Sequence, residues 1–423
     1  MIPPILMRLF LLGLLATLGC ATSPPAPTTP PAVRTGAAVL ADEAFRPLDG
    51  LRVGLIVNHT ARVDSVHLID LLHAAPHVTL AALFGPEHGL RGEADAGEAV
   101  ADGRDIRTGV PVYSLYGTTR KPTPAMLAGL DALVFDIQDI GARFYTYIST
   151  MGLAMQAAAE AGIPFYVLDR PNPLGGETVT GFVLDTTYAS FVGAYPIPIV
   201  HGLTVGELAR MIQGEGMLPG LDALDLRVIP MQGWRRAMQW PDTGLPWIRP
   251  SPNIPDFETA LVYPGTCFLE GTTASEGRGT RAPFRQVGAP WVDAETLADT
   301  LNGRGLPGIR FEPVTFTPEA IPGMASDPKH RGLPVHGVRL VVTDRHAYRP
   351  VATGLHVLAA LYRQAPPSER ATFLKERWLH LLAGTDRLYR YLIDGVPADE
   401  MARAWAEEVA AFRQRRAPYL LYD

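Results

Sequence analysis

The sequence predicts an α/β protein with two parts: a Rossmann-like, doubly wound and mainly parallel sheet lobe, then a smaller α+β C-terminal domain. Three observations support this. The chain has 423 residues, 47% of them hydrophobic, enough for a sizeable core. Short β-branched or apolar runs alternate with helical patterns over residues 39–265, as in βαβ units. Beyond Gly265 the pattern changes, so we place the second domain at 266–423.

Each element follows from its local pattern. In the first lobe, buried strands are predicted at 53–57, 80–84, 132–136, 165–169 and 226–229, with helices at 66–74, 149–161 and 203–213. After a Gly-rich loop, we expect a helix at 294–302, strands at 311–316 and 338–343, and a closing helix at 398–413.

The N-terminus resembles an export signal. Arg8 precedes an apolar run over 9–18, which is too short to span a bilayer but fits a signal peptide covering 1–19. Cys20 then opens a Pro/Thr-rich segment that we assign to a tether over 20–38. We therefore expect a lipoprotein anchored to a membrane through Cys20, periplasmic or at the cell surface. A plain cleaved signal with an incidental cysteine is the alternative.

Composition and motifs exclude several classes of partner. The net charge is −6 and no basic run occurs, which argues against nucleic-acid binding. The turn after the first strand, 58–62, has no glycine, so it lacks the loop that the pyrophosphate of NAD requires. No P-loop, H-E-x-x-H or G-x-S-x-G motif occurs. We therefore expect no cofactor and no metal.

Polar residues are concentrated in three loops that follow predicted strands. These loops span 85–92, 136–145 and 169–176. Ligands of open α/β sheets bind outside the carboxyl ends of the strands, so we expect the three loops to meet along one rim.

Carboxylates in these loops, together with those in the Gly-rich segment 269–280 at the predicted domain junction, suggest glycosidic cleavage. This reaction needs one carboxylic acid to protonate the leaving oxygen and usually a second carboxylate to attack or to activate water. Glu87, Asp136 and Glu276 are the candidates. For each of them, a loop cap or a partner for a nearby arginine is an equally good interpretation of the spacing.

Six segments resemble, in order, the signature segments of the exo-β-N-acetylmuramidase family, glycoside hydrolase family 171. They are residues 84–89, 135–147, 169–176, 201–208, 249–255 and 275–280. The resemblance implies an exo-acting hydrolase that removes N-acetylmuramic acid from the non-reducing ends of peptidoglycan fragments, with its active site between the two parts. It implies Glu87 as the general acid, while the second carboxylate is either Glu276 or Asp136.

The substrate itself suggests which residues bind it. N-acetylmuramic acid carries an ionised lactyl carboxylate, and an arginine is its natural bidentate partner. Arg143, Arg170 and Arg278 are candidates, with Arg278 preferred because it lies beside Glu276 in the Gly-rich loop. The other expected substrate-binding residues are His88, Tyr145, Asn172, His201, Asn253, Glu270 and Ser275.

Two further functions stay open. A two-lobed, sugar-binding lipoprotein without catalysis shares the tether and the α/β architecture. Several carboxylates in one cleft would repel an anionic sugar unless one of them is protonated, which favours the enzyme. A hydrolase that acts on a different glycan is the second alternative.

Overall fold

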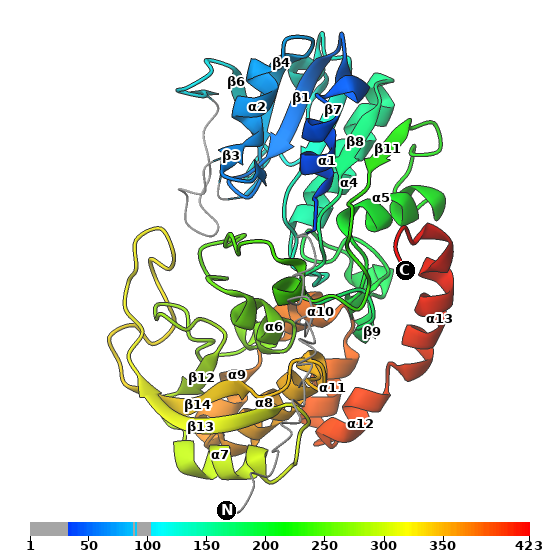
Figure 1. Cartoon of the computed structure of the whole chain (residues 1–423). Helices are drawn as coiled ribbons and strands as arrows, with labels where there is room; N and C mark the ends of the chain where they lie inside the picture. The colour runs from blue at the N-terminus through cyan, green and yellow to red at the C-terminus, as the bar shows by residue number, and fades with distance from the viewer. Residues whose placement is uncertain (1–32, 88, 91–102) are drawn as a thin grey trace, which may run out of the picture. The chain divides into compact units, whose positions relative to one another are not determined.

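A seven-stranded sheet organises the N-terminal half of the protein (Figure 1). The computed structural model describes residues 33–87, 89–90 and 103–423. The strand order is β11-β8-β7-β1-β4-β6-β5, and its described neighbours are parallel except for β5 and β6. The strands are β1 (Arg52–Val57), β4 (Thr79–Gly85), β5 (Gly103–Arg104), β6 (Pro111–Ser114), β7 (Ala132–Asp136), β8 (Phe165–Leu168) and β11 (Leu226–Ile229). The order reverses between β1 and β7 as in Rossmann sheets, which confirms the predicted fold class.

Side chains alternate between the two faces of the sheet, and helices cover both faces. Leu55 of β1 is buried in one apolar cluster and the next residue, Ile56, in the other. The covering helices are α1 (Gly36–Asp42) and α2 (Leu68–Ala74) on one face, and α4 (Tyr147–Ala161) and α5 (Val205–Gly214) on the other. The apolar cluster that contains Ile56 continues into the C-terminal half, so the two halves share one core.

Smaller elements complete this half. They are α3 (Pro124–Leu127), the antiparallel pairs β2 (Arg62–Val63) with β3 (Val66–His67) and β9 (Thr180–Val183) with β10 (Pro198–Val200), and the 3-10 turns η1 (Arg46–Leu48), η2 (Thr186–Tyr188) and η3 (Trp240–Thr243). The helix predicted at 66–74 begins only at Leu68. Residues 66 and 67 pair with β2 instead, and the His67 side chain accepts a hydrogen bond from the Ile69 amide as the N-cap.

The folded unit begins earlier than the predicted domain boundary. Thr35 caps α1 by accepting a hydrogen bond from the Ala38 amide, and residues 36–40 are buried. Residues 33–38, the last part of the predicted tether, therefore belong to the folded unit. The signal peptide, Cys20 and His88 lie outside the described residues.

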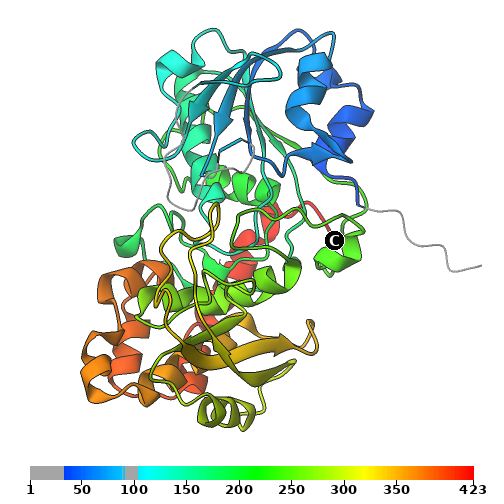
Figure 2. The same ribbon diagram turned by 90° about the vertical axis from the view of Figure 1, so that its left-hand side faces the viewer.

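The C-terminal half combines a small antiparallel sheet with helices (Figure 2). The sheet order is β12-β14-β13, with β12 (Gln286–Ala289), β13 (Ile309–Phe316) and β14 (Val335–Val342). The helices are α6 (Phe257–Thr266), α7 (Ala294–Asn302), α8 (Pro350–Gln364), α9 (Pro367–Phe373), α10 (Glu376–Ala383), α11 (Arg387–Ile393), α12 (Ala398–Arg403) and α13 (Ala406–Arg416), with the 3-10 turns η4 (Cys267–Gly271) and η5 (Ala417–Tyr419). None of the helices described for the chain is long and apolar enough to cross a membrane.

Helices α6 and α8 cross at a pair of glycines. A Cβ atom added to Gly354 would overlap the backbone of Gly265, and one added to Gly265 would overlap the carbonyl of Pro350. The helices can therefore approach this closely only because both positions lack a side chain.

The closing helix predicted at 398–413 is two helices in the structure. The break falls at Ala404 and Trp405, between α12 and α13. Trp405 is buried and its ring packs edge-on against Phe182 of β9 at 5.0 Å. This tertiary contact accompanies the break that the local sequence pattern did not indicate.

The C-terminal tail returns to the first lobe. Helix α13 runs beside β9, and the chain ends near α5 (Figure 1). The Tyr422 hydroxyl donates to Asp169 Oδ2 at 2.5 Å, and the Leu421 amide donates to Glu207 Oε1 at 2.9 Å. Asp169 follows β8 and Glu207 lies in α5, so the tail closes one edge of the lobe.

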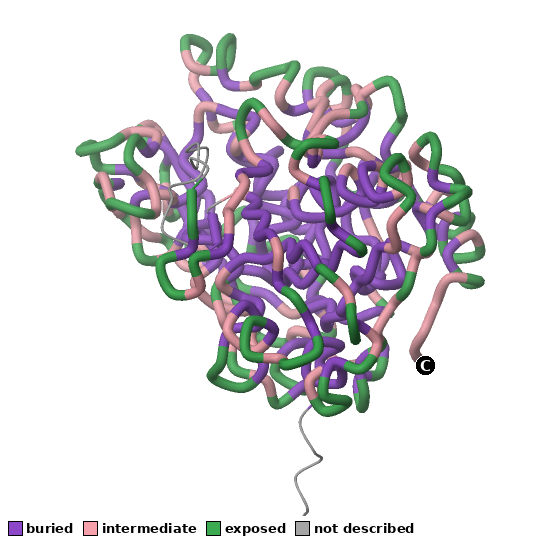
Figure 3. The backbone as a smooth tube through the Cα atoms, turned by 90° about the horizontal axis from the view of Figure 1, so that it is seen from above, coloured by how far each residue is buried: buried purple, intermediate pink, exposed green. Residues whose placement is uncertain are grey.

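Arg143 links the two halves from inside the core. Arg143 is completely buried. Much of the chain around the centre of the protein is buried as well, as the purple tube in Figure 3 shows. Arg143 NH1 donates to the carbonyls of Phe182 and Ile197, and its NH2 donates to those of Leu382 and Ala383 at the end of α10. Burial lowers the pKa of Arg143 to about 9. The guanidinium thus fixes α10 against the first lobe.

Candidate active site

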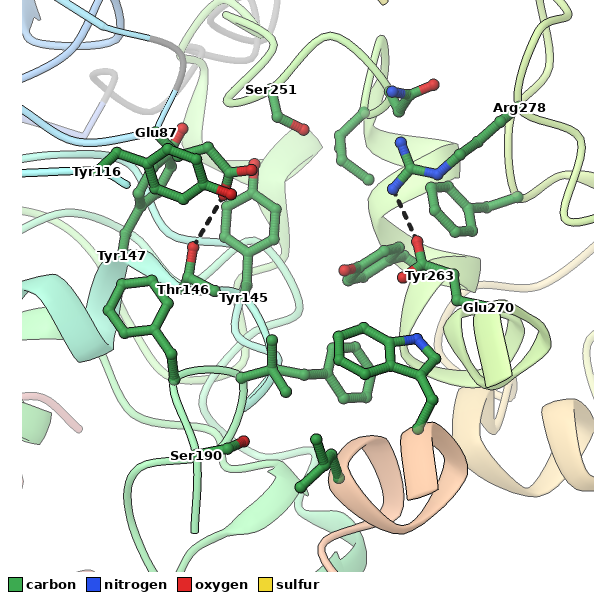
Figure 4. Close-up of a pocket in the computed structure, with 18 of the residues that line it drawn as sticks. Glu87, Tyr116, Tyr145, Thr146, Tyr147, Ser190, Ser251, Tyr263, Glu270 and Arg278 are labelled. Atoms are coloured by element: carbon green, nitrogen blue, oxygen red, sulfur yellow. Dashed lines mark hydrogen bonds and ion pairs between the residues drawn. The ribbon is translucent and has the colours of Figure 1, made fainter. Parts of the chain in front are cut away.

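A cavity of about 530 Å³ lies where loops of the first lobe face the C-terminal half (Figure 4). This volume is in the usual range for small-molecule sites. The cavity is lined by Glu87, Tyr116, Arg120, Phe144, Tyr145, Thr146, Tyr147, Ser190, Phe191, Val192, Ser251, Asn253, Ile254, Tyr263, Glu270, Arg278, Phe284, Trp378 and Leu381. It therefore combines carboxylates, arginines and many aromatic rings.

Glu87 forms one wall, just beyond the end of β4. The hydroxyl of Thr146, the residue before α4, donates to Glu87 Oε2 at 3.2 Å. Burial, followed by the charge of Glu87 and a hydrogen bond with it, raises the pKa of Tyr116 to about 12. Glu87 is thus held by groups from the strand-end loops after β6 and β7.

Arg278 and Glu270 form the opposite wall (Figure 4). Arg278 NH2 lies 2.7 Å from Glu270 Oε1, and its guanidinium lies 5.1 Å from the centre of the Phe284 ring. Burial works to lower the pKa of Arg278, but the charges of Glu270 and Glu276 outweigh it and raise the pKa. Arg278 therefore keeps its positive charge beside the cavity.

Aromatic rings fill the space between these walls. Tyr145 packs edge-on against Tyr147 at 5.1 Å and against Tyr263 at 6.1 Å. Tyr263 in turn packs edge-on against Phe284 at 4.7 Å. Burial is the main cause that raises the pKa values of Tyr145, Tyr147 and Tyr263, so these hydroxyls stay protonated at neutral pH. Such rings offer both apolar faces and hydrogen-bonding groups to a sugar.

The structure brings five of the predicted site residues together at this cavity. They are Glu87, Tyr145, Asn253, Glu270 and Arg278. Asn253 is held by its own contact, because its side-chain amide donates to the Met324 carbonyl at 2.6 Å. His88 precedes a segment outside the described residues and is itself not described.

Asp136 and Arg170 are placed elsewhere. Asp136 is completely buried, and its two carboxylate oxygens accept from Arg170 Nε at 2.5 Å and from NH2 at 2.8 Å. This bidentate ion pair lies outside the lining of the cavity. The loop at 169–176 meets the loop after β7, since the Gln138 side chain donates to the Pro171 carbonyl at 2.8 Å, so the expected shared rim is present, but this loop contributes no residue to the lining of the cavity.

The remaining predicted residues of the first lobe have internal partners. Arg143 donates to four carbonyl oxygens, as described above. Asn172 donates to the Leu203 carbonyl at 2.9 Å and accepts from the Leu174 amide. His201 is 1% exposed, and its Nδ1 accepts from the Leu203 amide. Burial lowers the pKa of His201 to about 3. These side chains stabilise loops and do not line the cavity.

Glu276 and Ser275 support the wall from behind. Glu276 is 3% exposed and lies 2.9 Å from Lys329 Nζ and 3.6 Å from Arg278 Nε. Burial works to raise the pKa of Glu276, but the charges of Lys329 and Arg278 outweigh it and lower the pKa. A general acid must be protonated near neutral pH, so Glu276 does not fit that role. Ser275 accepts a hydrogen bond from the Gly277 amide.

Several lining residues could not be found from sequence. Tyr116 and Arg120 follow β6, an edge-proximal strand with a weak apolar pattern, and Trp378 lies on α10 in the other half of the chain. An aromatic residue on an amphipathic helix predicts core packing, and nothing local distinguishes Trp378 from that case. Thr146 could have been suspected, because it lies within the signature segment 135–147 and shortly before the helix predicted at 149–161.

Metal-ligating side chains do not gather in the described residues: no group of three or more His, Cys, Asp or Glu residues there could hold an ion. Cys267 is buried, and burial raises the pKa of its thiol well above the usual range. The chemistry of the cavity therefore rests on Glu87, Glu270 and Arg278.

Two carboxylates on facing walls of a cavity rich in aromatic rings are the groups that glycosidic cleavage uses, so a glycoside hydrolase is the class of enzyme that fits this site. The chain belongs to the exo-β-N-acetylmuramidase NamZ family, as its sequence motifs predicted. The family's N-terminal model matches residues 53–258 and its C-terminal model matches residues 261–422.

Known relatives cover nearly the whole chain. The peptidoglycan β-N-acetylmuramidase NamZ of Bacillus subtilis (strain 168) is 46% identical over 389 residues, which are 92% of this chain and 91% of the relative. Two crystal structures of DUF1343 family proteins from Bacteroides fragilis NCTC 9343 are similar. One has a TM-score of 0.85 and 40% identity, covering 93% of this chain and 99% of the other. The second has a TM-score of 0.76 and 36% identity, covering 92% and 99%.

Proposed function

We propose that this protein is an exo-acting glycoside hydrolase that removes N-acetylmuramic acid from the non-reducing end of peptidoglycan fragments. The main observation behind the proposal is that Glu87 lies on the cavity wall, in a chain that belongs to this family. The similarity to the Bacillus subtilis enzyme supports the same substrate class.

Glu87 has the position that a general acid requires. It faces the open cavity, is half-buried, and is oriented by the hydrogen bond from Thr146. In the proposed reaction, Glu87 donates its proton to the glycosidic oxygen as the bond to the anomeric carbon breaks.

Glu270 is the carboxylate that we propose for the second role, on water or on the anomeric carbon. It lines the same cavity as Glu87, from the opposite wall (Figure 4). Of the two candidates taken from the sequence, Asp136 is held by Arg170 and Glu276 by Lys329. Both are buried outside the cavity lining, so neither is assigned this role.

Arg278 is the residue that we propose to bind the lactyl carboxylate. Its NH2 is engaged by Glu270, and its NH1 has no hydrogen bond within the described part of the chain. The other two arginines considered from sequence are engaged inside the protein. A guanidinium on the cavity wall can therefore distinguish muramic acid from glucosamine by charge.

Two chromogenic glycosides test the proposal. The purified protein is incubated with an aryl β-N-acetylmuramic acid glycoside and with the matching N-acetylglucosamine glycoside, and release of the aryl group is followed. Release from the muramic acid glycoside alone supports the proposal. Release from both indicates a hydrolase with a different specificity, and binding without release indicates a sugar-binding receptor.

We propose further that the protein is exported and anchored to a membrane through a lipid on Cys20. A short apolar run over 9–18, followed by Gly19, Cys20 and a Pro/Thr-rich segment, supports this location. The substrate class supports it as well, because peptidoglycan lies outside the cytoplasmic membrane.

A further inference from the structure

The cavity continues onto the surface of α10. Trp378 and Leu381 line the cavity, and the same two side chains line a shallow depression of about 500 Å³ together with Lys375, Glu376 and Arg377. Leu381 also borders a second depression of about 460 Å³ against η2. The catalytic cavity and these two depressions are therefore adjacent, with α10 as their common floor.

The surface of α10 beyond Trp378 carries unpaired positive charge. Lys375 and Arg377 are exposed, and neither makes an ion pair within the described residues. Burial, followed by the charge of nearby Lys329, lowers the pKa of Lys375, while the charges of Glu276 and Glu270 act against this shift, so Lys375 lies near the charged groups behind the cavity wall. Glu376 lies between the two exposed cations and reduces their combined charge to +1.

This arrangement contrasts with the cations around Glu270 and Glu276, which are paired, whereas Arg120 on the cavity wall lies over the Phe191 ring at 4.4 Å. Arg278 is paired with Glu270, and Lys329 with Glu276. A ligand carboxylate that reaches Lys375 and Arg377 displaces no protein partner. The part of the substrate that bears this carboxylate needs only to extend from the catalytic cavity along the surface of α10.

We infer that α10 forms an aglycone-binding extension of the active site, in which Lys375 and Arg377 bind a carboxylate carried by the glycan beyond the scissile bond. The inference rests on the proposed function. An exo-acting enzyme holds one terminal sugar in its cavity, so the rest of the fragment must leave through an open side. Trp378 provides an aromatic surface at the start of that path.

The chemistry of peptidoglycan fragments supplies such a carboxylate in two ways. A second muramic acid, two sugars beyond the bond that is cleaved, carries a lactyl carboxylate. Where that lactyl group bears a peptide, the carboxylates belong to the peptide. Both sources present a carboxylate to α10, and substrates with and without the peptide distinguish between them.

The test compares kcat/KM for four substrates in the full-length protein. The reference is the chromogenic muramic acid glycoside, which has no sugar beyond the bond. The others are the disaccharide with a neutral N-acetylglucosamine aglycone, the trisaccharide ending in muramic acid, and the same trisaccharide with a peptide on that terminal muramic acid. Each value is expressed as a ratio to the reference.

In K375A/R377A, we expect the ratio for a substrate with an anionic aglycone to fall about 5- to 30-fold, as the loss of two solvent-exposed ion pairs implies. The disaccharide ratio should stay the same. Glu376→Gln removes the only negative charge that lines the first depression, so it should raise the kcat/KM ratio for the substrates with an anionic aglycone. Salt at about 1 M should remove the preference in the unsubstituted protein, since exposed charges are screened.

Arg403→Ala is the matched control, because Arg403 is another exposed arginine of this half and lines neither the cavity nor either depression. A fall with the free trisaccharide identifies the lactyl carboxylate, and a fall only with the peptide-bearing one identifies the peptide. Equal ratios in K375A/R377A and in the unsubstituted protein would overturn the inference. Absence of any release from the chromogenic glycoside would instead overturn the proposed function.

Discussion

Thr146 and Glu87 are 59 residues apart in sequence, yet the threonine hydroxyl donates to Glu87 Oε2 at 3.2 Å. Thr146 is the last residue before α4, and Glu87 follows β4, so the contact joins two strand-end loops of the same sheet edge. The parallel sheet thereby orients the carboxyl that we propose as the general acid.

Glu87→Gln should lower kcat by at least about 10²-fold, because the amide cannot donate the proton that the leaving oxygen requires. The amide keeps the size of the side chain, so the thermal midpoint should remain close to that of the unsubstituted protein. Turnover of the chromogenic muramic acid glycoside gives the rate. Nearly normal turnover in a folded variant would move the acid role to another residue.

Arg278→Ala should lower kcat/KM about 10- to 150-fold for the muramic acid substrate, the effect of one charge-assisted hydrogen bond. The same variant is assayed on a substrate that lacks the lactyl group. A selective loss supports carboxylate binding. Equal loss on both substrates would show that Arg278 only orders the loop through Glu270 and Glu276.

Cys20→Ser should release the protein from the membrane fraction or block its processing, because serine cannot accept the thioether-linked lipid. Fractionation of expressing cells, followed by mass measurement of the N-terminus, checks this outcome. A variant that stays membrane-bound with unchanged maturation would contradict the anchor.

His201→Asn should remove part of the acid sensitivity of the fold. The folded-state pKa of His201 is about 3 against 6.5 for a free histidine, so below pH 6.5 only the unfolded chain gains the proton. This histidine therefore lowers the free energy of unfolding by about 2 kcal/mol between pH 7 and pH 5. Urea unfolding at both pH values should show a smaller decrease in the variant. An identical decrease would mean that His201 is protonated in the folded protein.

Gly354→Ala should destabilise the protein by about 2 kcal/mol or more, since the added methyl group overlaps the backbone of Gly265 where α6 and α8 cross. Gly103→Ala is the matched control, because a Cβ atom there meets nothing within 4 Å. Urea unfolding compares the two variants. Equal stability would show that the helices separate without cost.

Most of the parallel sheet could be predicted from sequence because its strands are continuous apolar runs buried on both faces. The predicted strand at 132–136 matches β7, and the helix at 294–302 matches α7. Strand β6 carries a weak pattern near the sheet edge and was missed. The division between α12 and α13 was missed as well, because it coincides with the tertiary contact of Trp405 with Phe182.

The candidate site was only partly predictable, for an electrostatic reason. Arg143, Arg170 and Arg278 look alike in sequence, since each lies in a polar, Gly-containing loop. Whether such a guanidinium faces a ligand depends on which internal acceptors the fold supplies. Arg143 meets four carbonyl oxygens and Arg170 meets Asp136, whereas Arg278 reaches the cavity. These acceptors come from distant parts of the chain, so they cannot be inferred from the local sequence.

The return of the C-terminal tail has a consequence for biosynthesis. Asp169 and Glu207 leave the ribosome more than two hundred residues before Tyr422 and Leu421, their partners at the edge of the first lobe. During synthesis, the sheet can form while this edge still lacks its last donors. The lobe that is made first is therefore completed only after Leu421 and Tyr422 have been synthesised.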